Sequence, residues 1–207
     1  MDLYEQRERR RAKLVADTPL TDLGYFQTNN CRVLPNRLEL LHHLPGRGIV
    51  AEIGAAFGSY SAEILARNRP RELHLIDAWD TDRYRVGMKE IEKSFASEIR
   101  AGRLHLHQGY STARLKKFSD NFFDWVYIDT NHTYQTTWEE LVLCDAKVKR
   151  EGHIAGHDFC TGNVVRPMVY GVIQAVAKFC AEYGWQYEYI TLESHGHFSF
   201  CLKRLGL

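Results

Sequence analysis

The 207-residue sequence contains no long hydrophobic run and no paired cysteine motif. No apolar stretch approaches the roughly 18 residues that a membrane-spanning helix needs, so we expect no membrane partner. The five cysteines are odd in number and lack C-x-x-C spacing, which argues against a disulfide framework and a zinc knuckle. They are Cys31, Cys144, Cys160, Cys180 and Cys201. Because the charged N-terminal residues also lack the core of a signal peptide, we expect a cytoplasmic protein.

Excess charge of either sign is also missing. The formal net charge is +1, which gives no support for a nucleic-acid partner. The length suits one domain with a sizeable core, and we divide the chain into an N-terminal helical or lid segment at residues 1–34 and a main domain at 35–207. Residues 1–15 carry mixed charge and predict an exposed helix. Residues 17–34 are rich in turn formers and would either close over a site as a lid or pack on the domain edge.

The most informative stretch is 48–65, which predicts a buried strand, a glycine turn and a helix. Gly54 lets the chain turn where a side chain would clash, and Gly58 lets the backbone approach a ligand and opens the helix. Glu52 stands at the end of the strand, where a buried carboxylate is costly unless something pairs with it. A ligand that carries a positive amine would supply that partner.

A second strand is predicted at 72–77 and ends in Asp77, about twenty residues beyond the glycine turn. In nucleotide-binding α/β folds an acid at this place accepts hydrogen bonds from ribose hydroxyls. The third strand, at 104–108, leads to a turn at Gly109 and Tyr110 that would meet an adenine. Its His105 and His107 alternate with leucines, which favours one face of an edge strand over metal ligands.

The remaining pattern predicts a doubly wound α/β fold. Further strands are expected at 122–129, 153–159, 185–191 and 197–202, with the last two forming an antiparallel hairpin, and a long helix is expected at 164–183. Five βα units followed by a hairpin predict a seven-stranded Rossmann-like sheet in the order 3-2-1-4-5-7-6, with strand 7 antiparallel. Polar residues would then gather at the carboxyl ends of the strands, where such sheets bind ligands. These residues are Glu52, Asp77, Gly109, Asp129, His157 and Asp158.

Four stretches, at 51–65, 75–77, 124–134 and 152–159, together resemble class I S-adenosylmethionine-dependent methyltransferases. The runs Tyr-Ile-Asp-Thr-Asn-His-Thr-Tyr and Gly-His-Asp-Phe are similar to a subgroup of O-methyltransferases that act on sugars and natural products. The resemblance covers about 35–202. It implies methyl transfer from S-adenosylmethionine to a hydroxyl of a small molecule by in-line displacement. It also implies that the cofactor contacts Glu52, Gly54, Ala55, Gly58, Asp77, Ala78, Gly109, Tyr110 and Asp129.

The same resemblance suggests the catalytic residues. His132 and His157 are candidate bases for the acceptor hydroxyl, assisted by Asp129. Catechol-type O-methyltransferases are similar here and hold a divalent cation such as Mg²⁺, which Asp129 and Asp158 would bind in this chain. The chain departs from their pattern twice. His132 stands in place of a lysine, and Phe159 replaces a metal-binding asparagine.

Two other functions remain open at this stage. A nicotinamide-dependent oxidoreductase would carry a G-x-G-x-x-G turn and no terminal hairpin. This sequence lacks that turn and predicts the hairpin. A non-catalytic S-adenosylmethionine-binding protein would share the fold, but it would have no need of a base at the fourth and fifth strands.

Overall fold

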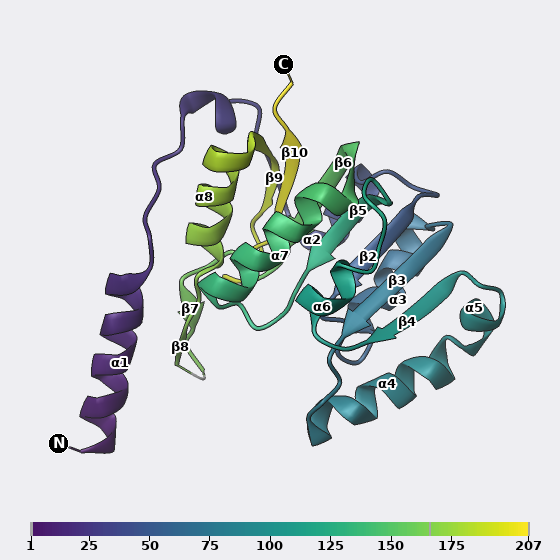
Figure 1. Cartoon of the computed structure of the whole chain (residues 1–207), viewed down its shortest axis with the longest axis horizontal. Coiled ribbons are helices and arrows are strands. Elements are labelled where there is room, and N and C mark those ends of the chain that lie inside the picture. Colours follow the sequence, from purple (N-terminus) through teal and green to yellow (C-terminus); the bar gives the residue numbers. More distant parts are fainter. Residues whose placement is uncertain (1, 166, 207) are drawn as a thin grey trace.

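The computed structural model describes residues 2–165 and 167–206, which form one twisted sheet with helices on both faces (Figure 1). Eight strands make up the sheet. They are β1 (Arg32–Leu34), β2 (Ile49–Ile53), β3 (Glu72–Asp77), β4 (Leu104–Gln108), β5 (Phe123–Ile128), β6 (Val148–Gly156), β9 (Trp185–Thr191) and β10 (Phe200–Arg204). A separate small hairpin contains β7 (Gly162–Asn163) and β8 (Met168–Val169).

The strand order is β1-β9-β10-β6-β5-β2-β3-β4. Only β10 runs against the others, because it pairs antiparallel with both β6 and β9. The order from β9 to β4 confirms the predicted arrangement 3-2-1-4-5-7-6 with an antiparallel seventh strand. The sequence did not predict β1, which extends the sheet beyond β9 as a parallel edge strand.

The helices cover the sheet in two layers, and each layer has its own hydrophobic core. They are α1 (Leu3–Asp17), α2 (Arg37–His43), α3 (Ser59–Glu63), α4 (Asp82–Ser94), α5 (Ala96–Arg100), α6 (Ser111–Leu115), α7 (Tyr134–Lys147) and α8 (Val172–Tyr183), with short turns η1 (Tyr25–Gln27) and η2 (Ile64–Asn68). One core joins α6, α7 and α8 to the sheet through residues such as Leu141 and Phe179. The other joins α2, α3 and α4 through Leu41, Tyr60 and Ile91. Among the described residues, no helix is both long and apolar enough to cross a membrane.

The predicted helix over 164–183 is wrong in its first third. The chain forms the β7–β8 hairpin there, and α8 begins only at Val172. The backbone of Gly162 and Asn163 pairs with that of Val169 and Met168, and the N–H of Tyr170 donates to Thr161, so these groups are engaged in a hairpin in place of a helix. The last strand also begins later than predicted, at Phe200.

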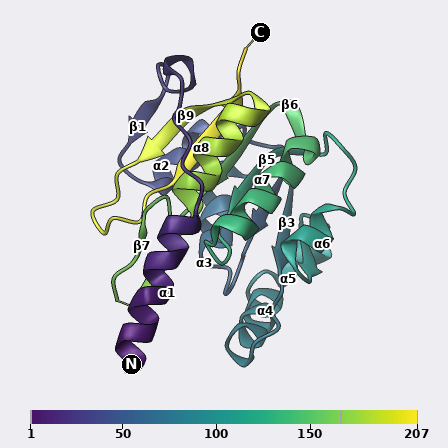
Figure 2. The same cartoon turned by 60° about the vertical axis from the view of Figure 1, so that its left-hand side comes forward.

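The N-terminal segment divides into parts with different surroundings. No residue of α1 is buried, as expected for an exposed helix, and α1 lies beside the β7–β8 hairpin (Figure 2). Residues 25–34 fit the alternative expectation of a segment that packs on the domain edge. Arg32–Leu34 is a strand of the sheet, and η1 precedes it at the amino end of the strands, opposite the edge where ligands bind.

The close approach of β2 and β5 generates a first prediction. Gly54 has φ +96°, and a Cβ built on it would lie 1.9 Å from the carbonyl oxygen of Asp129. We expect Gly54→Ala to lower the free energy of unfolding by about 4 kcal/mol or more, because the strands must separate. Gly102 is the matched control, since it also has positive φ but has nothing within 4 Å of its Cβ position. Gly102→Ala should cost only about 1–2 kcal/mol in urea unfolding, and equal losses in the two variants would contradict this reading.

Candidate active site

A cavity of about 280 Å³ opens at the carboxyl ends of β2, β3 and β5. Five residues predicted from the sequence line it: Gly54, Asp77, Ala78, Tyr110 and Asp129. Ala56, Asp80, Thr81, Tyr84, Ser111, Thr130, Asn131, Thr136 and Glu140 also line it. The structure therefore brings together the ends of three predicted strands around one space, as the α/β topology requires.

The glycine turn and Asp77 form the floor of this cavity. One carboxylate oxygen of Asp77 accepts a hydrogen bond from the backbone N–H of Ala56, and the other accepts one from Trp79, both at 2.9 Å. Trp79 is fully buried, and its indole N–H donates to the carbonyl of Ala56 at 2.8 Å. These bonds fix the Asp77 carboxylate beside the turn, with lone pairs left for the hydroxyls of a ligand.

Glu52 does not line the cavity. Its side chain is buried one layer below, where the hydroxyl of Ser61 donates a short hydrogen bond to it. Burial raises the pKa of Glu52 to about 8, an effect that the hydrogen bond from Ser61 and the nearby Arg37 only partly offset. The expected pairing with a ligand amine stays a prediction.

The other predicted cofactor residues have different surroundings. The space beside Gly58, whose φ is +78°, is filled by Ile91 of α4, so packing alone accounts for this glycine. Ala55 is buried, and Gly109 precedes the rim residue Tyr110. The hydroxyl of Tyr110 donates to Asp80 at 2.7 Å across the mouth of the cavity.

Glu140 is a cavity residue that the sequence analysis missed. It is fully buried, and its two oxygens accept hydrogen bonds from Ser111 at 2.5 Å and Thr130 at 2.9 Å. Burial raises its pKa to about 7, an effect that these hydroxyls only partly offset. Its position three residues after Thr137 and four before Cys144, on the buried stripe of α7, was the signal that could have revealed it.

Asp158 is the centre of a cluster of three histidines. Its Oδ2 lies 3.0 Å from Nε2 of His132, and its Oδ1 lies 3.6 Å from Nδ1 of His157. His197 makes a short contact with the same Oδ1. The sequence predicted a strand from residue 197 onward, yet β10 begins only at Phe200, and residues 192–199 leave the sheet and carry His197 to Asp158.

Asp129 joins this cluster to the cavity. Its Oδ2 lies 3.7 Å from Nδ1 of His157 and 3.5 Å from the guanidinium of Arg37. Arg37 in turn stacks on the ring of Tyr60, with 4.6 Å between the guanidinium carbon and the ring centroid. Nothing local in the sequence indicated Arg37, because it reaches the site only through the unpredicted pairing of β1 with β9.

Members of the cluster have pKa values shifted in different directions. Burial opposes the charge on Asp158, but the contacts with His132 and His157 outweigh it and hold the pKa of Asp158 well below its usual range. Burial likewise lowers the pKa of His132, yet its contact with Asp158 leaves the pKa above the ordinary value. Burial raises the pKa of Asp129 despite the nearby histidines. The result is an ionised Asp158 that favours a charged His132.

The donor set does not fit Mg²⁺. The ion prefers near-octahedral oxygen ligands. Asp129, His132 and Asp158 offer ligand atoms within 4.8 Å of one another, but one of the three is a nitrogen. The oxygens of Asp158 already face histidines, and the guanidinium of Arg37 stands where a cation beside Asp129 would be repelled.

Comparison with known proteins is informative at the level of family. A profile of a family described as a methyltransferase domain matches residues 51–159, more than half of the chain. The match begins in β2 and ends directly after Asp158, so it contains the glycine turn, Asp77 and most of the histidine cluster. A search among curated proteins found no match.

Solved structures of similar fold carry several activities. The tRNA methyltransferase TrmK from B. subtilis has a TM-score of 0.60 at 11% identity, over 84% of this chain and 67% of that chain. An O-methyltransferase family protein from Burkholderia thailandensis gives 0.59 at 12%, over 82% and 55%. Spermidine synthase from Thermotoga maritima gives 0.55 at 16%, over 84% and 58%. At such low identity these likenesses show the fold alone.

The buried carboxyl of Glu52 generates a prediction about pH. Its ordinary pKa of 4.5 rises to about 8 on folding, so between these values the folded chain holds a proton that the unfolded chain has lost. The free energy of unfolding should therefore fall across this range, by up to about 1.4 kcal/mol per pH unit from this group. Glu52→Gln keeps an oxygen for Ser61 and should flatten the profile, as measured by urea unfolding from pH 5 to 8.

The control for this measurement is Glu151→Gln, because the side chain of Glu151 is 94% exposed. It should leave the profile unchanged. Part of the slope up to about pH 7 should persist in Glu52→Gln, since Glu140 is also buried with a raised pKa, and should disappear on adding Glu140→Gln. If the free energy of unfolding of the parent rises between pH 5 and 8, the raised pKa of Glu52 is refuted.

Proposed function

The chain belongs to the methyltransferase-domain family and is an S-adenosylmethionine-dependent methyltransferase, and from this premise we propose that it methylates a hydroxyl group of a small molecule. The observation that carries the proposal is the histidine cluster around Asp158, which adjoins the cavity through Asp129. Methyl transfer to a hydroxyl requires removal of a proton, and this cluster supplies a base.

The cavity supports the cofactor side of the proposal. Asp77 would accept hydrogen bonds from the ribose hydroxyls, since both its oxygens are already oriented by backbone N–H groups. The rim at Tyr110 and Ser111, with Glu140 behind it, offers polar partners for the adenine. Asp129, at the end of β5, would lie between the cofactor and the acceptor.

His157 is better placed than His132 to act as the base. Its Nδ1 faces the carboxylates of Asp129 and Asp158, which favours the tautomer that carries the proton on Nδ1. Its Nε2 is buried and has no hydrogen-bond partner among the described residues, so its lone pair would accept the proton of a hydroxyl once acceptor binding uncovers this atom. His132 directs its Nε2 at Asp158 and would serve as the cation that keeps Asp158 ionised.

The reaction then needs little beyond positioning. The sulfonium of the cofactor already activates the methyl group, so the protein must hold the acceptor oxygen in line with it. His157 takes the proton of the hydroxyl as the new bond to carbon forms, and S-adenosylhomocysteine leaves. The direct test is turnover with S-adenosylmethionine against a panel of hydroxylated metabolites. Cofactor binding without turnover on any acceptor would favour the non-catalytic alternative.

The cofactor assignment is tested by binding. Calorimetry should detect S-adenosylmethionine and S-adenosylhomocysteine but no comparable binding of NAD. We expect Asp77→Ala to weaken S-adenosylmethionine binding by about 1–3 kcal/mol, because charge-assisted hydrogen bonds to the ribose are lost. Asp82→Ala is the control, since that side chain is fully exposed on α4. Equal affinity in the parent and in Asp77→Ala would remove Asp77 from the site.

The base assignment is tested by kinetics. His157→Ala should lower turnover by roughly 10²–10⁴ with cofactor affinity near normal, because the proton of the acceptor loses its receiver. His132→Ala should lower turnover less. His42→Ala is the control and should leave turnover unchanged, because His42 lies on the exposed face of α2.

Two further outcomes of the kinetic experiment are decisive. A loss confined to His132→Ala would transfer the role of base to that residue. Inhibition of the parent by a chelator, with a mild effect of both histidine variants, would support a metal at Asp129 and Asp158 in place of simple base catalysis.

A further inference from the structure

A second cluster of ligating side chains lies away from the cavity, where β3 and β4 pair. In the parallel register His74 is opposite His105, and Glu72 precedes His74 by two residues on the same face of β3. Three side chains of metal-ligand chemistry therefore share one face of two neighbouring strands. Their ligand atoms all lie within 4.8 Å of one another.

The ligand atoms lie close to the spacing that a zinc ion needs. Oε2 of Glu72 lies 3.6 Å from Nε2 of His74 and 3.7 Å from Nε2 of His105. Zinc binds histidine nitrogen and carboxylate oxygen at about 2.0–2.2 Å, so tetrahedral ligands lie roughly 3.4 Å apart. The rings of His74 and His105 are stacked, with centroids 4.6 Å apart and planes inclined by 17°, so the more exposed His105 would have to turn its ring for both lone pairs to meet at one ion. The other oxygen of Glu72 is turned to Arg71, at 3.4 Å from its Nε.

The cluster is hard to explain without a ligand. His74 is 95% buried, since only 5% of it is exposed, and its Nε2 has no hydrogen-bond partner among the described residues. Nε2 of His105 is likewise buried and without a partner in that part of the chain. Leaving two such atoms unsatisfied costs roughly 1–3 kcal/mol each. Both point at the oxygen of Glu72 from beyond hydrogen-bonding distance.

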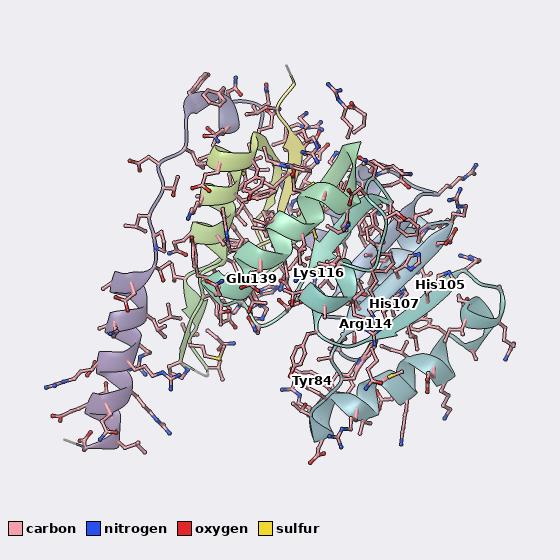
Figure 3. The ribbon with its side chains drawn as sticks, in the orientation of Figure 1. Tyr84, His105, His107, Arg114, Lys116 and Glu139 are labelled. Atoms are coloured by element: carbon pink, nitrogen blue, oxygen red, sulfur yellow. The ribbon has the colours of Figure 1, made fainter. Side chains whose placement is uncertain are left out.

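The surroundings position the ring of His74. Its Nδ1 lies 2.9 Å from Nε2 of His107, and in the tautomer that donates the Nδ1 proton to His107 the lone pair stays on Nε2 for a metal. Its ring packs edge-on against Phe118 and Phe123, which fixes the orientation of the imidazole. Figure 3 shows His105 and His107 following one another along β4. The site remains open to solvent through Glu72, whose side chain is 30% exposed.

We propose that Glu72, His74 and His105 bind one zinc ion that ties the edge strand β4 to β3, with His107 as the supporting hydrogen-bond partner of His74. Two imidazoles and a carboxylate are a usual zinc ligand set, and water would fill the fourth position from the solvent side. This reading replaces the sequence-based expectation that His105 and His107 are merely the face of an edge strand. It concerns stability rather than methyl transfer, and it holds whatever the acceptor is.

The experiment is a zinc titration of chain stripped of metal by chelator, followed by calorimetry and thermal unfolding. The parent should bind one zinc ion at this site and unfold at a higher temperature in its presence, since a ligand that binds only the folded state stabilises it. Glu72→Gln and His105→Ala should each weaken this binding by at least about 100-fold, and His107→Ala by about 10–100-fold. Glu72 and His105 are partly exposed, so these variants test the site without creating a cavity at the buried His74.

Two controls separate this site from other histidine and carboxylate pairs. His43→Ala removes a histidine that lies 3.4 Å from Glu39 on α2 but has no third ligand, and it should leave zinc binding unchanged. Asp158→Ala dismantles the cluster at the cavity and should also leave this site intact. Zinc binding that Glu72→Gln and His105→Ala do not weaken, or that is lost only in Asp158→Ala, would overturn the proposal, as would a parent that binds no zinc.

Discussion

The close contact between the ends of β2 and β5 determines the geometry of the candidate site. The backbone N–H of Asp129 donates to Ile53 at 2.7 Å, and the missing side chain of Gly54 leaves room for the carbonyl of Asp129. This contact places the cavity and the histidine cluster side by side, since Asp129 lines the first and contacts the second. Because Asp129 is held by this backbone contact, their separation is defined before any ligand binds.

Several ionisable groups are buried around this contact, and their pKa values shift in opposite directions. Glu52 and Glu140 have only hydroxyl partners, so their pKa values rise and both tend to be neutral near pH 7. Asp158 has three histidines around it and stays ionised. The difference lies in the partners, since all three are buried. A neutral carboxyl can donate a hydrogen bond and an ionised one can orient an imidazole, so one edge of the sheet offers both functions.

Most of the fold was predictable because it follows from local patterns. The strands at 72–77, 104–108 and 185–191 were predicted with the bounds that the structure has, and the strand order follows from the topology of βα units. The β7–β8 hairpin was missed because its backbone pairing, and the bond from the N–H of Gly171 to His132, depend on tertiary context that the local pattern does not contain. In the site, residues that follow a strand directly, such as Asp77 and Asp129, were found from the sequence. Arg37 and His197 were not, because distant pairings bring them there.

The pairing of β1 with β9 gives the N-terminal segment a role that its sequence did not suggest. The three residues of β1 form the edge of the sheet, and the chain passes from them within two residues into Arg37. The boundary at residue 35 would therefore cut through a structural unit, because a chain begun there would lose the strand that aims the guanidinium at Asp129. The bare edge of β9 would then be free to pair with another molecule. An excised domain could thus keep the cavity and still have a different electrostatic balance around Asp129.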